Sequence, residues 1–383
     1  MKMINPFERG IELRKTLVKD GKVLCVDFAL TLQKQDITKD VIQDVDTGRH
    51  AYRAKINIRS LDYELRRQKG LPPFDFSDEK AILVELHNDE SFDIPLWFLR
   101  KAGDKLENIA KYDLSLMYQI KGCNFHDGSS SGGCHFCFVD DKSNNGCPED
   151  GIYLSVDNIA NTFERYRKEK GLLTIRTSGG EPTLVLDHIL ALYQELAKRN
   201  LPILAQFDSN LSTASLIDYF EQQGVFPKNI LEKIAEYDPK VLVAFKGTDN
   251  ESIKGNTQAS LKIEEQIEAV KKFVQSGVDI YPYIYGPNPD TLEDFLSRLD
   301  QQVENILLKI HIGKLQLFSP ARERLRLIAQ QRGEDAEKAA EDYFRNADKN
   351  HELCIAIMNK VLDQRYGFGY KQLERPGIRL RLR

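Results

Sequence analysis

The chain has 383 residues, with 54 Lys and Arg against 58 Asp and Glu, a net charge of −4, and 41% hydrophobic residues. The hydrophobic fraction is enough to build a core, which excludes wholesale disorder, and the near-neutral charge gives no global basic field for nucleic acid or a membrane surface. Because no apolar run reaches about 18 residues and residues 1–17 lack an apolar centre, we expect a cytoplasmic protein without a membrane span or secretory signal.

Residues 1–111 are predicted to form an N-terminal β-rich extension. Alternating polar and apolar positions over Ala54–Ile58 and Ala81–Leu86 indicate short strands. The Leu71–Pro73 segment predicts a turn, and Trp97 supplies a large apolar side chain for a small separate layer.

Residues 112–320 alternate between strand-like apolar runs and segments of helical period. The predicted strands are Asp113–Ile120, Leu172–Arg176, Ile203–Phe207, Val241–Phe245, Ile280–Ile284 and Lys314–Phe318. The predicted helices are Asp157–Lys170, with Asp157 as its N-cap, Asp187–Arg199, Glu264–Ser276 and Thr291–Val303. Six such units predict an α/β fold with a parallel sheet. We expect a partial (β/α)6 TIM-like barrel, with an open doubly wound sheet as the alternative.

Residues 321–383 are predicted to form a C-terminal helical extension that ends in a short edge strand. One helix is expected around Ala336–Phe344 and a second from Glu352 to Gln364. The last residues alternate between apolar Ile378, Leu380, Leu382 and the arginines between them. This period of two favours a half-buried edge strand over a nucleic-acid-binding tail.

The six cysteines are too few for a disulfide scaffold, yet four of them lie between positions 123 and 147. Cys123, Cys134 and Cys137 form a C-x10-C-x2-C segment directly after the first predicted strand of the sheet. Three cysteines in one loop can hold three irons of a [4Fe–4S] cluster, which leaves the fourth iron open as a catalytic position.

A second motif, Gly179-Gly180-Glu181-Pro182, follows the next predicted strand. Its glycines let the backbone approach a ligand closely, and the polar groups at the end of a strand can bind a charged group. Glu181 adds a carboxylate, and Pro182 is suited to start the helix that follows.

Together the two motifs resemble the radical S-adenosylmethionine (radical SAM) superfamily over about residues 112–320. Its members bind a [4Fe–4S] cluster through three cysteines after strand one and the amino group of SAM through a Gly-Gly-Glu-Pro motif after strand two. Their usual cysteine spacing is C-x3-C-x2-C with an aromatic residue before the third cysteine. Phe136 matches that aromatic residue, whereas the first gap here is expanded by a glycine- and serine-rich insert.

The resemblance implies roles for particular residues. Cys123, Cys134 and Cys137 are expected to bind the cluster, Gly179, Gly180, Glu181 and Pro182 to anchor SAM, and Phe136 to shield the cluster or pack by adenine. Further SAM contacts are expected from Asp208, Ser209 and Asn210 after strand three and from Lys246 after strand four, although a solvated lysine is an equal alternative. The sequence gives no catalytic residue beyond these.

The implied activity is reductive cleavage of SAM at the cluster to a 5′-deoxyadenosyl radical, which abstracts hydrogen from the substrate. The oxidoreductase, lyase or transferase subclass stays open. A small molecule or cofactor precursor is the favoured substrate, and tRNA or a protein is the alternative. An electron donor such as ferredoxin or flavodoxin is implied as a partner, without a membrane.

The rival hypothesis is a non-enzymatic module with a structural zinc site. Cys147 could complete a four-thiolate site with the other three cysteines, or His126 or His135 could supply an imidazole. Zinc ribbons usually pair two Cys-x-x-Cys knuckles, and only one occurs here, so Cys147 is expected to be a loop thiol.

Overall fold

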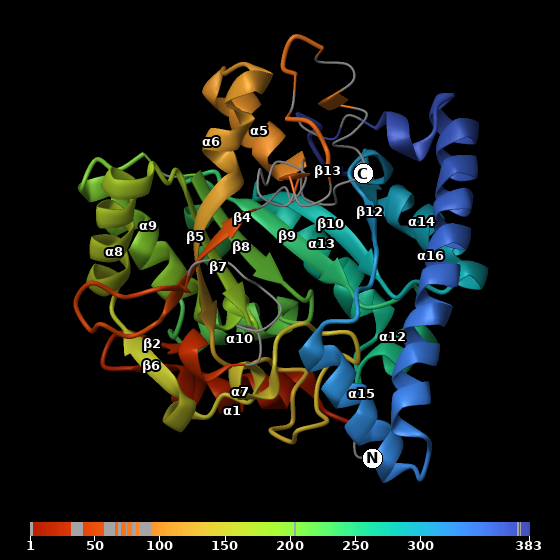
Figure 1. Ribbon diagram of the computed structural model, residues 1–383, viewed down its shortest axis with the longest axis horizontal. Helices are drawn as coiled ribbons and strands as arrows, with labels where there is room; N and C mark the ends of the chain where they lie inside the picture. Colours follow the sequence, from red (N-terminus) through yellow and green to blue (C-terminus); the bar gives the residue numbers. More distant parts are fainter. Residues whose placement is uncertain are drawn as a thin grey trace.

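The sheet at the centre of the molecule has six parallel strands in sequence order (Figure 1). The computed structural model describes residues 3–31, 41–56, 66–67, 70–73, 75–78, 82–83, 93–202, 204–373, 375 and 377–383. The parallel strands are β5 (Leu114–Ile120), β7 (Thr174–Gly179), β8 (Leu204–Ser209), β9 (Lys240–Phe245), β10 (Asp279–Tyr285) and β12 (His311–Gly313). The predicted six-stranded α/β core is therefore confirmed.

Helices connect these strands and cover the outer face of the sheet. They are α8 (Val156–Lys170), α9 (Leu186–Lys198), α10 (Ala214–Gln222), α11 (Ile230–Ala235), α12 (Asn250–Asn256), α13 (Ile263–Gln275) and α14 (Pro289–Gln302). Two smaller elements, α7 (Asp141–Asn144) and β6 (Gly151–Leu154), lie between β5 and α8. Short 3-10 turns are η1 (Phe28–Leu30), η3 (Leu106–Asn108), η4 (Pro148–Asp150), η5 (Pro182–Val185), η6 (Ile306–Leu308) and η7 (Tyr370–Gln372).

Two details of the predicted core are wrong. The sixth strand is β12, so Lys314–Phe318 is irregular chain rather than a strand. Its pairing with β10 stops where Tyr285 meets Gly313, because β10 itself ends there and offers no further backbone partner. The N-cap of α8 is Ser155, not Asp157, because the Ser155 hydroxyl and the Asn158 side chain bond each other's backbone amides in a capping box.

The N-terminal part contributes helices as well as strands. Its elements are α1 (Pro6–Leu17), β1 (Val18–Lys19), β2 (Lys22–Val26), β3 (Val41–Ile42), β4 (Tyr52–Ile56), α5 (Asp93–Ala102) and α6 (Ile109–Asp113). Strands β2 and β4 pair antiparallel with β5 and extend the main sheet. Ile82 and Leu83 are helical, contrary to the predicted strand, and the rest of Ala81–Leu86 lies outside the described residues, as do Asn57 and Ile58. Trp97 belongs to α5.

The two faces of the parallel sheet differ in polarity. The outer face is apolar, as Ile175, Phe207 and Val241 illustrate. The register brings polar residues together on the inner face: Gln119, Arg176, Ser178, Gln206, Asp208, Lys240 and Asp279. Branched apolar residues dominate the interior of an ordinary closed barrel. A polar inner face is therefore typical of a sheet that encloses a polar ligand or ions rather than a dry core.

Helix α5 covers part of this inner face. Phe98 and Leu99 pack with Tyr281 and Tyr283 of β10 in one buried cluster. The Lys240 ammonium lies 4.9 Å from the centre of the Trp97 ring, within the range of a cation–π contact. The N-terminal segment is thus part of the barrel interior as well as an edge of the sheet.

The C-terminal part begins with α15 (Ser319–Gln331) and α16 (Ala336–Tyr366). Figure 1 shows α16 along one side of the molecule, where it packs against α14 and α15. The two predicted helices are in fact one, because Ala340, Cys354 and Met358 continue a buried stripe with no glycine or proline between them. At the end of the chain β13 (Arg381–Leu382) pairs with β11 (Val303–Glu304) as a short edge ladder.

Candidate functional site

The three cysteines of the first motif lie in the loop that follows β5. Cys134 is buried, and Cys123 and Cys137 are partly exposed. The Cys137 amide donates to the Cys134 carbonyl at 3.1 Å, so the Cys-x-x-Cys pair forms a single tight turn. The glycine- and serine-rich insert between Cys123 and Cys134 lies outside this turn, and the turn brings two of the three thiols to the same place.

Amide donors and charges surround the sulfur atoms. The Asn210 side-chain amide lies 3.7 Å from the Cys123 sulfur, and that of Asn144 lies 3.8 Å from the Cys137 sulfur. Burial raises the pKa of Cys134 to about 11, although Lys246 opposes this shift. Burial and the charges of Cys134, Glu181 and Cys137 raise the pKa of Cys123. Thiols with raised pKa values that act on one another suit a shared cationic ligand, because binding a metal favours their deprotonated form.

The two glycines of the second motif lie against the cysteine loop itself. The amides of Gly180 and Glu181 donate to the carbonyls of Ile120 and Gly122, each at 2.9 Å. A Cβ atom on Gly180 would lie 1.8 Å from the Gly122 carbonyl oxygen, and Gly179 has a φ of +110°. These glycines therefore bring the two loops together, a role that the sequence reading, which had them face a ligand, did not foresee.

Glu181 is buried, and both of its carboxylate oxygens are bonded. It accepts from the Thr183 hydroxyl and, at 2.8 Å, from the backbone amide of Asn210. Burial raises the pKa of Glu181 to about 7, against the opposing effects of these donors and of Lys246. Pro182 begins η5, which leads directly into α9. The carboxylate is therefore held at the junction of the loops after β5, β7 and β8.

Lys246 projects from the end of β9 into the same region. Its ammonium lies 5.7 Å from the centre of the Phe136 ring and 5.5 Å from that of Tyr285. It also acts electrostatically on Cys134 and Glu181. Lys246 is half-buried between these groups.

The three residues expected after strand three have different surroundings. Asp208 faces inward and accepts from Arg176 at 2.8 and 3.0 Å and from Ser178 at 2.5 Å. The Ser209 hydroxyl bonds toward Glu181 and accepts from the Leu211 amide. Asn210 is 6% exposed and joins the Cys123 and Glu181 loops. Only Asp208 of the three faces the inner side of the sheet.

The residues of the rival zinc site do not gather around one point. The His126 imidazole bonds to Asp141 at 3.1 Å and accepts from the Gly128 amide. Burial lowers the pKa of His135 to about 4, and its ring lies against Tyr343. Cys147 lies near enough to Lys121 to act on it electrostatically, against the burial that lowers the pKa of this lysine. In the described part of the chain, no group of three or more His, Cys, Asp and Glu side chains is placed to hold a single metal ion.

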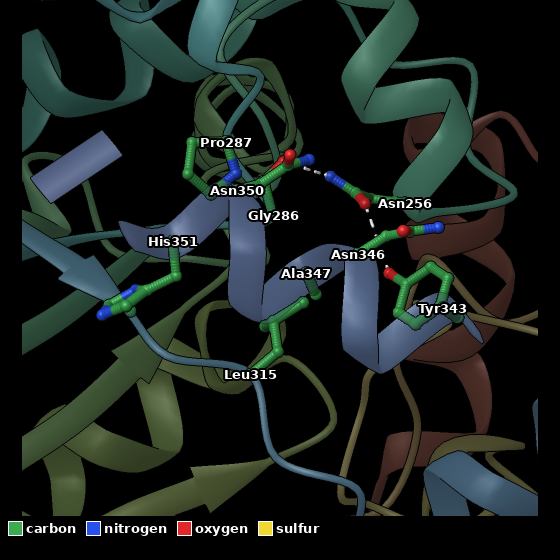
Figure 2. A pocket seen from close by; sticks show the side chains of 10 residues that line it. Asn256, Gly286, Pro287, Leu315, Tyr343, Asn346, Ala347, Asn350 and His351 are labelled. Atoms are coloured by element: carbon green, nitrogen blue, oxygen red, sulfur yellow. Dashed lines mark hydrogen bonds between the residues drawn. The ribbon is translucent and has the colours of Figure 1, made fainter. Parts of the chain in front are cut away.

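A cavity of about 150 Å³ opens where the carboxyl ends of β10 and β12 face α16 (Figure 2). Figure 2 shows Asn256 between Gly286 and Tyr343, and its amide donates to the Gly286 carbonyl at 2.7 Å. The backbone carbonyl of Asn256 accepts from the backbone amide of His135 at 2.9 Å. The cavity is therefore connected to the cysteine turn by one residue.

Sequence reasoning missed Asn144 and Arg324. Arg324 is 2% exposed and bonds the carbonyls of the cysteine turn. The sequence did contain a signal for Arg324, because this charged residue occupies a position in the apolar stripe of its helix, between Pro320 and Ile328. Asn144 lies in an ordinary polar loop sequence, and nothing in that sequence distinguishes it.

Comparison with known proteins identifies the family of the central segment. Residues 117–299 match the family model of the radical SAM superfamily. No curated protein matches the chain. Within the described residues, no helix is both long and apolar enough to cross a bilayer.

Two solved structures illustrate the similarity. The cobalamin-dependent S-adenosylmethionine radical enzyme OxsB, with aqua-cobalamin and S-adenosylmethionine bound, is 17% identical over 61% of this chain and 32% of that chain, with a TM-score of 0.37. A spore photoproduct lyase variant with bound AdoMet and dinucleoside spore photoproduct is 12% identical over 58% of this chain and 62% of that chain, with a TM-score of 0.37. The chain thus spans about a third of the length of OxsB.

Proposed function

We propose that Cys123, Cys134 and Cys137 of this radical SAM enzyme bind the [4Fe–4S] cluster that such enzymes use. The proposal starts from the match of residues 117–299 to the radical SAM superfamily. The family match over these residues agrees with the resemblance seen in the sequence and supports the SAM radical chemistry that it implied. When bound, the cluster and SAM together supply an electron and a sulfonium whose cleavage gives a radical able to abstract hydrogen.

The proposed ligand set fits the cluster by its chemistry. Three thiols come from one loop, two of them from a single turn, and amide donors lie within 3.7 and 3.8 Å of two of the sulfurs. Hydrogen bonds to cluster sulfurs and thiolates are among the features by which a protein sets the properties of an iron–sulfur centre. Cys147 is left out of this set, and an iron without a protein ligand remains for SAM.

We assign SAM to the region bounded by the second motif and the ends of β8, β9 and β10. Gly180 and Glu181 bring their loop against Cys123, and the carboxylate of Glu181 is suited to a cationic amino group. Lys246 supplies a positive charge between Phe136 and Tyr285 that suits a carboxylate. Asp208 and the inner-face residues near it are then left to face the substrate, with Gly179, Pro182, Ser209 and Asn210 as supports.

We infer the substrate class from the polarity of the inner face of the sheet. A small polar molecule or cofactor precursor fits this face better than an apolar one. Within the described residues, the buried side-chain amides of Gln119 and Gln206 and the Nε of Arg176 have no hydrogen-bond partner, and an apolar ligand would leave them so. We keep tRNA or protein modification as the alternative, and we propose ferredoxin or flavodoxin as the electron donor in the cytoplasm.

The observation that carries this proposal is the packing of the second motif directly onto the cysteine loop. It is tested by incubating the anaerobically reconstituted protein with SAM and dithionite and measuring 5′-deoxyadenosine by chromatography. We expect release from the wild type and from Cys147→Ser, and none from Cys134→Ser. A wild type that binds one zinc and no iron, and releases no 5′-deoxyadenosine, would favour the zinc module instead.

A further inference from the structure

Two carbonyl groups of the cysteine turn and one that directly follows it converge on a single arginine of the C-terminal extension. Arg324, on α15, donates to the carbonyls of Cys134 at 3.2 Å, Cys137 at 2.9 Å and Val139 at 2.9 Å. It is 2% exposed. A guanidinium has five donors in a fixed planar arrangement, so one side chain can fix three backbone groups relative to one another. The turn that carries two of the proposed ligands is therefore shaped by a residue distant in sequence.

The charge of Arg324 is only partly balanced. Its ion pair with Asp141 spans 3.8 Å, and the same Asp141 oxygen already bonds to His126 at 3.1 Å. Asp141 is also 29% exposed, so water screens its carboxylate. Carbonyl dipoles lower the cost of burying a guanidinium without cancelling its charge. A positive charge in a region of low dielectric thus lies directly behind the cysteine turn.

A second arginine bonds the same loop from the N-terminal extension. Arg9, on α1, donates to the His126 carbonyl at 2.9 Å and to the Asn145 carbonyl at 3.0 Å. Helices α1 and α15 lie at the same end of the molecule (Figure 1). Arg9 is 20% exposed and paired with Glu12. It therefore supports the flanks of the loop but places no unscreened charge behind the turn, which makes it a matched control for Arg324.

We propose that Arg324 is a positioning residue of the cluster site, which fixes the Cys134–Cys137 turn and, through its buried charge, raises the reduction potential of the cluster bound there. The inference rests on the proposed function, because it needs a cluster at these cysteines. Reduction adds one negative charge to the cluster, so a nearby positive charge stabilises the reduced form more than the oxidised form. The C-terminal extension would then help to decide whether a given donor can reduce the enzyme.

The test is a redox titration of the anaerobically reconstituted full chain, followed by electron paramagnetic resonance, with iron and sulfide counted for each variant. At a fixed potential we expect Arg324→Met to lower the ratio of reduced to oxidised cluster about tenfold, equal to about 59 mV for a one-electron couple. Arg324→Lys keeps the charge and should stay within about twofold of the wild type. Arg9→Met should destabilise the fold without shifting the potential.

The outcomes separate this inference from the function on which it rests. A wild type that takes up no cluster overturns the proposed function and the inference together. A wild type that loads normally, with Arg324→Met at the same potential, overturns the inference alone. A shift of the potential as large in Arg324→Lys or in Arg9→Met also overturns the inference. Arg324→Lys keeps the positive charge behind the turn and Arg9→Met removes none from there, so such a shift would have another cause. If Arg324→Met loads no cluster, loading of Arg324→Lys at the wild-type potential supports the proposal, and its failure to load contradicts it.

Discussion

At the scale of single residues, Gly180 and Glu181 explain why two motifs 42 residues or more apart act as one site. Gly180 has no room for a side chain because a Cβ atom there would overlap the Gly122 carbonyl. Glu181 is buried with its carboxylate turned to Thr183 and Asn210. Each residue therefore satisfies a structural demand in addition to any contact with SAM. The two demands can be tested separately.

Gly180→Ala is expected to displace the Gly122–Cys123 backbone, because the new Cβ would lie 1.8 Å from the Gly122 oxygen. We expect a loss of at least ~1–3 kcal/mol of stability, the usual cost of overpacking, and less than one cluster per chain after reconstitution. Gly255→Ala is the control, since nothing lies within 4 Å of its Cβ position. Full iron content in Gly180→Ala would show that the loop contact is not needed.

Glu181→Gln is expected to stabilise the cluster-free protein above neutral pH. Because the pKa rises from 4.5 to about 7 on folding, the fold favours the protonated form, and stability is lost as pH rises from about 4.5 to 7. Glutamine mimics the protonated form, and the Thr183 hydroxyl can accept from its amide. At about 1.36 kcal/mol per pKa unit, the variant should gain roughly 1–3 kcal/mol at pH 8 and little at pH 4.

Denaturant unfolding of both proteins at several pH values measures this difference. Glu195→Gln serves as the control of opposite sign, because the Arg199 side chain lowers the pKa of Glu195. That variant should be less stable than the wild type at pH 8, with the difference vanishing at low pH. A Glu181→Gln difference that does not change with pH would contradict the assigned burial effect.

At the scale of secondary structure, elements were predicted well where the sequence pattern was regular. They were predicted poorly where a pairing partner decides whether a strand forms. Strands β5, β7, β8, β9 and β10 are continuous apolar or alternating runs, and their positions were predicted to within a few residues. Residues 314–318 have the same alternation, yet no strand forms because β10 ends at Tyr285. Pairing partners are a property of the fold, and the sequence of one strand does not contain them.

Helix α16 shows the same limit from the other side. The sequence predicted two separate helices here, whereas the buried stripe continues through Cys354, Met358 and Leu362 in one helix. Met358→Ala should therefore destabilise the protein by about 2–5 kcal/mol, the usual range for a buried methionine. Leu353 of the same helix is 48% exposed, so Leu353→Ala should change stability by less than about 0.5 kcal/mol. Similar effects of the two variants in denaturant unfolding would contradict the continuous helix.

The candidate site was predictable only in part, for a related reason. The cysteines and the glycine motif are local in sequence, so their spacing was visible. Asn144, Tyr285 and Arg324 reach the site from other elements, and only the folded chain brings them there. The supporting contacts of Gly179 and Gly180 were equally hidden, because the same glycines would serve a ligand or a neighbouring loop.

At the scale of the whole molecule, the extensions are integrated with the central sheet. Helix α5 covers the inner face next to Tyr281, and α1 and α15 each supply an arginine to the cysteine loop. The inner face of the sheet remains polar, with Arg176, Asp208 and Gln206 among its residues. The proposed cluster site at one end and the polar interior beside it are consistent with the proposal that the enzyme acts on a polar molecule inside its barrel.

The proposed chemistry requires a cluster iron that the protein leaves open to SAM. The most direct test is the electron paramagnetic resonance spectrum of the dithionite-reduced protein, recorded before and after addition of SAM. We predict that SAM changes the spectrum of the wild type and of Cys147→Ser, because it binds the cluster itself. A reduced [4Fe–4S] spectrum that excess SAM leaves unchanged would contradict the account.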